Sequence, residues 1–212
     1  MAGFNLRMDQ HEAFDIMVSV LAIALVFTFH QLGLNMNPSL FLFYMAAAVV
    51  TLGSGFVLHE LAHKYTAIKY GARARFQAWP AGLALALALV VVPQIIWGPG
   101  AGIFFIAPGA VYIYATRPIS MKENGIISLA GPATNLVLAI IFLLPLILIG
   151  PDTIGMQFST VLYIGVMINS WLALFNLIPI FPLDGSKVLA WDWKVWLLAI
   201  LFSLFLLSFP VV

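Results

Sequence analysis

The sequence predicts an all-α polytopic membrane protein with about five to six transmembrane helices and a short membrane-associated β or re-entrant insertion. This prediction rests on the composition of the chain and on the length of its apolar runs. Of 212 residues, 63% are hydrophobic and 8% are charged, whereas a soluble domain carries about 25% charged residues. We expect a single membrane-embedded domain over residues 1–212, with a core at about 40–188 and the insertion at about 76–116.

The apolar runs are the expected transmembrane helices, since a helix needs about 20 apolar residues to cross the hydrocarbon. Clear runs cover residues 16–34, 40–66, 126–149 and 156–180, and a shorter one covers 193–209. The first run is too long for a cleaved signal peptide, so we expect it to be retained. Residues 81–97 are also apolar, and the run that follows at 98–116 is interrupted by Gly and Pro.

Lys and Arg set the expected orientation, because short cytoplasmic loops carry an excess of both. Basic residues follow the run at 40–66 and precede the run at 126–149, whereas residues 31–39 and 150–155 have none. This pattern puts the N-terminus in the cytoplasm and requires the insertion to enter and leave the membrane on the same side. The insertion is then either a helix with extended return strands or a re-entrant hairpin. The small size suggests a prokaryotic cytoplasmic membrane.

The net charge argues against a nucleic-acid partner, and the cysteine count rules out thiolate ligands and disulfides. The formal net charge is +1, and the sequence has no basic cluster large enough to follow a phosphate backbone. We therefore expect a lipid bilayer around the protein and no nucleic-acid partner. Since the chain has no cysteine, disulfides and thiolate metal ligands are both excluded.

An HExxH motif, His59-Glu60-Leu61-Ala62-His63, lies inside the run at 40–66. On a helix, residues i and i+4 project from one face, so His59 and His63 can bind the same metal ion. Glu60 is placed to take a proton from the attacking water. Burying these polar groups at membrane depth costs several kcal/mol unless a cation compensates. The motif therefore predicts a hydrolase with one Zn²⁺ per chain that works within the bilayer.

The third ligand must be His, Asp or Glu, because catalytic zinc normally has three protein ligands and the chain lacks cysteine. We expect Asp184, which follows a helix end on the cytoplasmic side. Pro179 and Pro182 interrupt the helix there and let the chain turn Asp184 inward. The alternative for Asp184 is a turn or helix-end role. Nearby, the uncharged amide of Asn176 is expected to hold a substrate carbonyl or oxyanion, with an interhelical hydrogen bond as its alternative.

Three motifs together resemble the site-2 protease family of intramembrane zinc metalloproteases, in a compact form without PDZ or CBS domains. They are the HExxH motif, Gly131-Pro-Ala-Thr-Asn135, and the stretch from Asn176 to Asp184-Gly185, and the resemblance covers about residues 40–188. It implies that His59, His63 and Asp184 bind zinc and that Glu60 is the general base. It also implies that Asn176 binds the substrate backbone, and that a transmembrane protein substrate is cut within the bilayer.

The family also pairs an unwound substrate with a strand near its site, and residues 103–113 resemble that strand. We expect its first residues to contact substrate: Ile103, Phe104, Phe105, Ile106 and Ala107. Asn135 is a further expected substrate contact, although Gly131 and Pro132 also fit a role in which Asn135 locks closely packed helices.

The alternative functions are a transition-metal transporter and a metal-binding homologue without proteolytic activity. A transporter would place polar groups along a path through several helices, whereas these runs are nearly devoid of them outside the cluster. The intact Glu60 speaks against a homologue without activity. A CAAX-type membrane protease would take a Glu from a downstream helix, and the only later Glu is Glu123, in an expected loop.

Overall fold

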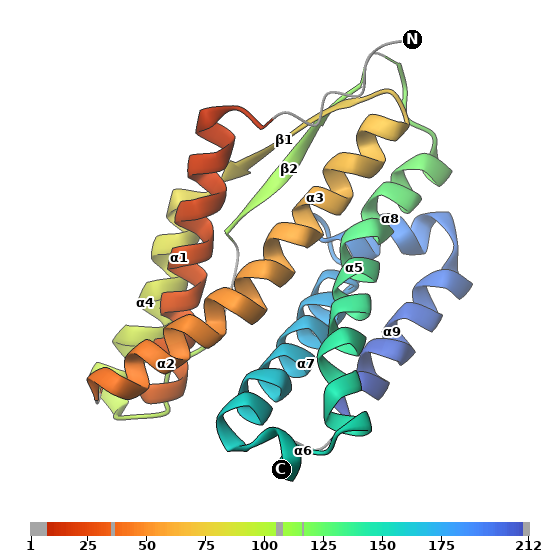
Figure 1. Cartoon of the computed structure of the whole chain (residues 1–212). Helices are drawn as coiled ribbons and strands as arrows, with labels where there is room; N and C mark the ends of the chain where they lie inside the picture. The colour runs from red at the N-terminus through yellow and green to blue at the C-terminus, as the bar shows by residue number, and fades with distance from the viewer. Residues whose placement is uncertain (1–7, 35–36, 105–107, 116, 210–212) are drawn as a thin grey trace. The chain divides into compact units, whose positions relative to one another are not determined.

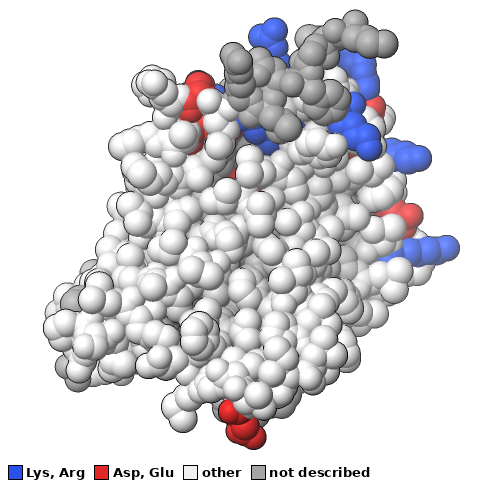
Figure 2. Space-filling view, in the orientation of Figure 1, with Lys and Arg blue, Asp and Glu red and all other residues white. Residues whose placement is uncertain are grey.

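The computed structural model describes residues 8–34, 37–104, 108–115 and 117–209, and most of them are helical (Figure 1). Among these residues, five helices are long and apolar enough to cross a membrane, and one shorter apolar helix follows. The visible surface is mostly uncharged (Figure 2). The protein is therefore an all-α integral membrane protein with a small two-stranded sheet, as the sequence predicts.

The contacts within the chain divide it into two units. Unit 1 contains Val57–Ala74 and Ile113–Val212, and unit 2 contains Arg7–Phe56 and Arg75–Tyr112. A continuous apolar helix, Pro38–Lys69, runs from unit 2 into unit 1. It consists of α2 (Pro38–Ala48), a π-helical segment η1 (Val49–Gly53) and α3 (Ser54–Lys69).

Unit 1 is built around α5 (Met121–Leu148). This helix packs against α7 (Met156–Asn176), α8 (Asp184–Trp191) and α9 (Trp193–Leu207), while α6 (Pro151–Ile154) forms a short turn before α7. The core between these helices is formed by Leu136, Ala139, Leu143, Leu146, Val166, Ala173 and Leu206.

Local sequence signals begin and position α5. Ser120 caps its first turn: the Ser120 hydroxyl accepts the Glu123 N–H at 3.2 Å, and the Glu123 carboxylate accepts the Ser120 N–H at 2.9 Å. Two glycines allow close packing. A Cβ at Gly125 would overlap Trp191 of α8, and a Cβ at Gly165 of α7 would overlap the Phe142 ring of α5. Close packing at these glycines fixes α7 and α8 on α5.

Unit 2 places α1 (Gln10–Leu32) against α2, η1 and α4 (Pro80–Trp97). Part of its core is formed by Val26, Ala86 and Val90. The sheet consists of β1 (Arg73–Ala78) and β2 (Gly109–Tyr114), and α4 lies between the two strands in sequence. The strands are antiparallel, because the residue after β1 is bonded to the residue before β2: the Trp79 N–H donates to the Pro108 carbonyl at 2.8 Å.

Carboxylates of α1 cover the second edge of β1. Since Trp79 faces β2, alternate residues of β1 turn their backbone groups the other way. The Phe76 N–H donates to Glu12 Oε1 at 3.1 Å, and the Ala78 N–H donates to Asp15 Oδ2 at 3.2 Å. This edge of the sheet is therefore hydrogen-bonded to side chains of α1.

The insertion is a helix followed by extended chain, which is one of the two expected forms. The run at 81–97 forms α4, and the residues described after it lead into β2. The strand expected from residue 103 begins at Gly109 instead, so this expectation is wrong for Ile103 and Phe104. The Ile103 N–H donates to the Leu89 carbonyl of α4 at 2.9 Å, and the Phe104 ring packs against Phe27 and His30. Phe105, Ile106 and Ala107 lie outside the described residues.

Replacing Gly165 with Val is expected to lower the free energy of unfolding by about 1–3 kcal/mol, because the added methyl groups overlap the Phe142 ring. Reversible unfolding in detergent measures this change. Adding Phe142→Leu to Gly165→Val should recover part of the lost stability, since the smaller Leu side chain leaves room for the Val methyl groups. Equal stability of wild type and Gly165→Val would contradict the close packing of α5 on α7.

Candidate metal centre

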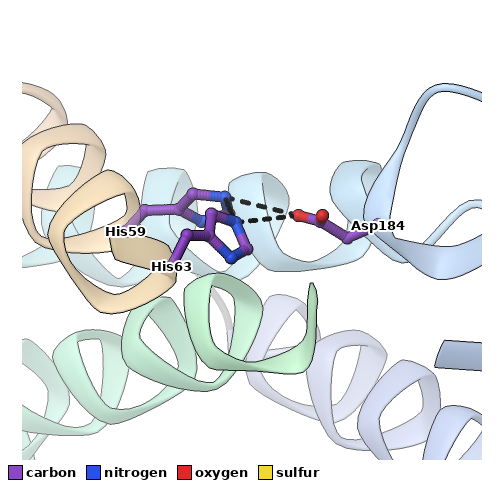
Figure 3. Close-up of side chains that lie close together, drawn as sticks. All are labelled: His59, His63 and Asp184. Atoms are coloured by element: carbon purple, nitrogen blue, oxygen red, sulfur yellow. Dashed lines mark hydrogen bonds and ion pairs between the residues drawn. The ribbon is translucent and has the colours of Figure 1, made fainter. Parts of the chain in front are cut away.

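Three potential ligands converge in unit 1 (Figure 3). His59 and His63 lie one turn apart on α3, and their Nε2 atoms are 3.0 Å apart. Asp184 is the first residue of α8, and its Oδ2 lies 3.1 Å from His63 Nε2 and 3.6 Å from His59 Nε2. The two histidines are 6% and 8% exposed. The structure thus brings together the three side chains expected to be metal ligands.

Hydrogen bonds on the far side of each imidazole determine which nitrogen carries the proton. His59 Nδ1 lies 2.6 Å from Asn135 Oδ1, and His63 Nδ1 lies 2.7 Å from the Ile127 carbonyl oxygen. Both partners are oxygen acceptors, so both Nδ1 atoms donate. Each Nε2 is then left with a lone pair, and both lone pairs point at the Asp184 carboxylate.

This arrangement fits a divalent cation. Two nitrogen lone pairs and a carboxylate that meet at one buried point repel each other unless a positive charge lies between them. Two imidazole nitrogens and one carboxylate oxygen are also a donor set of catalytic zinc sites, which leave a fourth position open.

Helix α5 forms the floor of the site. Ile127, Gly131 and Asn135 are spaced four residues apart, so they lie on one face of α5. A Cβ at Gly131 would overlap the Nε2 atoms of His59 and His63. Glycine at this position therefore makes room for the two imidazoles.

The turn between α7 and α8 positions Asp184. Helix α7 ends at Asn176, before the expected residue 180, and α8 begins at Asp184. Gly185 is required there, because a Cβ would overlap the Leu177 carbonyl. Asp184 Oδ1 lies 3.6 Å from Lys187 Nζ, so one carboxylate oxygen faces the lysine and the other faces the imidazoles.

The other expected site residues occupy different surroundings. Glu60 is buried and lies in the same turn of α3 as the two histidines. Asn176 is the last residue of α7, and its Nδ2 donates to the Leu172 carbonyl of the same helix at 2.9 Å. Asn135 is fully buried, and its amide contacts His59.

Sequence reasoning missed one buried residue near the site, Asn169 of α7. Asn135 Nδ2 donates to Asn169 Oδ1 at 3.0 Å. The available signal was an amide in the middle of an apolar helix, where polar residues usually bond to a neighbouring helix. The sequence gives no indication of its partner, which is 34 residues away in the chain.

Several curated proteins are similar to this chain over most of its length. "Putative zinc metalloprotease MJ0611" of Methanocaldococcus jannaschii is 40% identical over 193 residues, covering 90% of this chain and 89% of the relative. "Putative zinc metalloprotease YwhC" of Bacillus subtilis is 33% identical and covers 70% of this chain and 72% of the relative. "Putative zinc metalloprotease Rip2" of Mycolicibacterium smegmatis is 31% identical and covers 62% and 51%.

The chain belongs to the site-2 protease-like family of zinc metalloproteases. The expected cofactor, Zn²⁺, agrees with the names of these relatives and with the buried group of His59, His63 and Asp184. No protein-family model matches the chain, and no solved structure matches it.

Replacing Gly131 with Ala is expected to weaken zinc binding by about 10- to 100-fold, because the methyl group displaces the imidazoles from their common point. Competition with a chelator of known affinity measures the dissociation constant. Thr134→Val is the matched control: it lies on the same helix and removes only a bond to the Ala130 carbonyl, so affinity should not change. If Gly131→Ala binds zinc as tightly as wild type, the imidazoles do not need the space beside α5.

Proposed function

We propose that this protein is an intramembrane metalloprotease that hydrolyses peptide bonds within or near transmembrane segments of membrane-protein substrates. One Zn²⁺ held by His59, His63 and Asp184 serves the reaction. The observation that carries the proposal is the convergence of two imidazole lone pairs and a carboxylate on α3 and α8, with α3 forming the end of a 32-residue apolar helix. The names of the relatives favour this function over metal transport.

The site lies at a shallow depth that water can reach. His63 is six residues before Lys69, the last residue of α3, which corresponds to about 9 Å along a helix. Lys69 is expected at the headgroups, because a charged side chain avoids the hydrocarbon. By the distribution of basic loops, this side of the membrane is the cytoplasm. A shallow site suits a hydrolase, since water is one of its reactants.

Each residue of the site is proposed to have a separate task in peptide-bond hydrolysis. Zinc, when bound, supplies a Lewis acid that activates water and polarises the scissile carbonyl. Glu60 takes a proton from the water as its oxygen adds to the carbonyl carbon, and gives a proton to the amine as the C–N bond breaks. Asn176 is proposed to hold the substrate carbonyl. Because its Nδ2 is bonded to Leu172 in this structure, that contact requires rotation of the side chain.

An unwound substrate is proposed to pair with β2. Substrate backbone groups that leave a helix need new hydrogen-bond partners inside the membrane. Adding the substrate as a strand to the sheet supplies them. The far edge of β1 is bonded to Glu12 and Asp15, and the described residues form only two strands. The outer edge of β2 is therefore the edge that suits the substrate. Contact between the substrate and residues 103–107 stays a separate prediction.

Replacing Glu60 with Gln is expected to preserve zinc content and to lower cleavage of a model transmembrane substrate at least about 100-fold, because a neutral amide cannot accept the proton. Elemental analysis gives the metal content, and a gel assay in detergent or liposomes gives the cleavage rate.

Glu123→Gln is the matched control for Glu60→Gln, since Glu123 lies at the start of α5 and pairs with Arg117. It should cleave the substrate at the wild-type rate. If Glu60→Gln itself cleaves at the wild-type rate, Glu60 is not the general base. If Glu60→Gln loses its zinc, Glu60 is needed for the structure of the metal site, and the fall in cleavage does not report proton transfer.

A further inference from the structure

Three helices of unit 1 meet around the turn that carries Asp184. Helix α7 ends before this turn, α8 begins at Asp184, and only Asp192 separates α8 from α9. The Asp192 N–H donates to the Val188 carbonyl at 2.8 Å, and Asp192 Oδ1 accepts the Lys194 N–H at 2.9 Å. The first turn of α9 is thereby fixed close to the end of α8.

A hydrogen bond from α9 to the end of α7 closes this part of the chain into a ring that contains Asp184. The Trp196 indole N–H donates to the carbonyl of Leu177, 19 residues earlier in the chain, at 2.8 Å. Leu177 directly follows α7 and is fully buried. The last carbonyls of a helix have no partner within the helix, so a buried one needs a donor from elsewhere. Trp196 supplies that donor.

The Leu177 carbonyl also lies against the start of α8. A Cβ at Gly185 would overlap the carbonyl carbon and oxygen of Leu177, so the Gly185 backbone packs directly on this peptide group. Gly185 is the next residue after Asp184, whose Oδ2 faces both imidazoles. A displacement of the Leu177 carbonyl therefore shifts the backbone that carries the Asp184 carboxylate.

Hydrogen bonds inside the turn are local. The Ile180 N–H donates to the Ile178 carbonyl, and the Leu183 N–H donates to the Ile180 carbonyl, both at 2.8 Å. The Ser186 hydroxyl donates to the Leu183 carbonyl at 2.8 Å. These bonds shape the turn, but each joins residues at most three apart in the chain. The Trp196 bond instead fixes the turn to a separate helix.

We propose that Trp196 is a positioning residue for the zinc site. Its indole N–H holds the Leu177 carbonyl, and this carbonyl holds Gly185 and thus the Asp184 carboxylate in front of the imidazoles. A tryptophan near a membrane interface usually serves as an anchor in the headgroup region. Trp193, which is 59% exposed, fits that role. Trp196 is half-buried, and its N–H is used within the protein.

The inference rests on the proposed zinc site but not on proteolysis, so the test measures zinc binding. Purified full-length protein in detergent is titrated with zinc against a chelator of known affinity. Trp196→Phe keeps an aromatic ring but removes the N–H donor to Leu177. We expect it to weaken zinc binding by about 10-fold, the lower end of the range for groups that support metal ligands. Trp193→Phe is the matched control, and it should bind zinc as tightly as wild type.

An Asp184→Ala background separates positioning from packing. Without the carboxylate, only the two histidines are left to bind zinc, and the affinity should be lower. Trp196→Phe should cause no further loss in this background, because there is no third ligand to position. Equal losses in both backgrounds would show that Trp196 acts on the whole fold and would overturn the inference. A Trp196→Phe variant with wild-type affinity would overturn it as well.

A second measurement uses wild-type protein and does not depend on how a variant folds. Coupling between two equilibria is reciprocal, so if the Trp196 bond favours zinc binding, zinc favours the bond by the same factor. By NMR, the Trp196 indole N–H should exchange with deuterated solvent about 10-fold more slowly in zinc-loaded than in metal-free protein. An exchange rate that zinc leaves unchanged would overturn only this inference. Wild type that binds no zinc would contradict the proposed function as well.

Discussion

The repulsion between two imidazole lone pairs and a carboxylate is the constraint on which unit 1 depends. In water, solvent would screen these groups, but here they are buried in an apolar helical bundle. The protein keeps them together by holding the opposite side of each imidazole: Asn135 and the Ile127 carbonyl fix the rings of His59 and His63. The surrounding helices therefore maintain an arrangement that is favourable only when a cation is present.

Small residues make this arrangement possible. Gly131 lies where a larger residue would displace both rings, and Gly125 and Gly165 let α8 and α7 approach α5 closely. Such contacts are typical of helices in membranes, where close packing replaces the hydrophobic effect as the source of association. Helix α5 consequently contributes most of the site's surroundings without supplying a metal ligand.

Local patterns were sufficient to predict the helices and the three converging side chains. The four-residue spacing of His59 and His63 places them on one face of any helix. The absence of cysteine left His, Asp and Glu as candidates for the third ligand, and the expected place of Asp184 after a helix end on the cytoplasmic side singled it out. Contacts between residues distant in the chain could not be predicted in this way. The hydrogen bond between Asn169 and Asn135 is an example, because it depends on which residue of α5 faces α7. The strand start at Gly109 is another: the apolar residues before it favour a strand, but the Ile103 N–H is bonded to α4.

The carboxylates of Glu12 and Asp15 on β1 have a consequence for how copies of the protein meet. A two-stranded ribbon with both edges open would recruit strands from neighbouring molecules and grow into an aggregate. Carboxylate oxygens of Glu12 and Asp15 accept the outward N–H groups of Phe76 and Ala78, so these two donors are not available to an incoming strand. Addition of a strand from a neighbouring molecule is therefore disfavoured along this edge of β1.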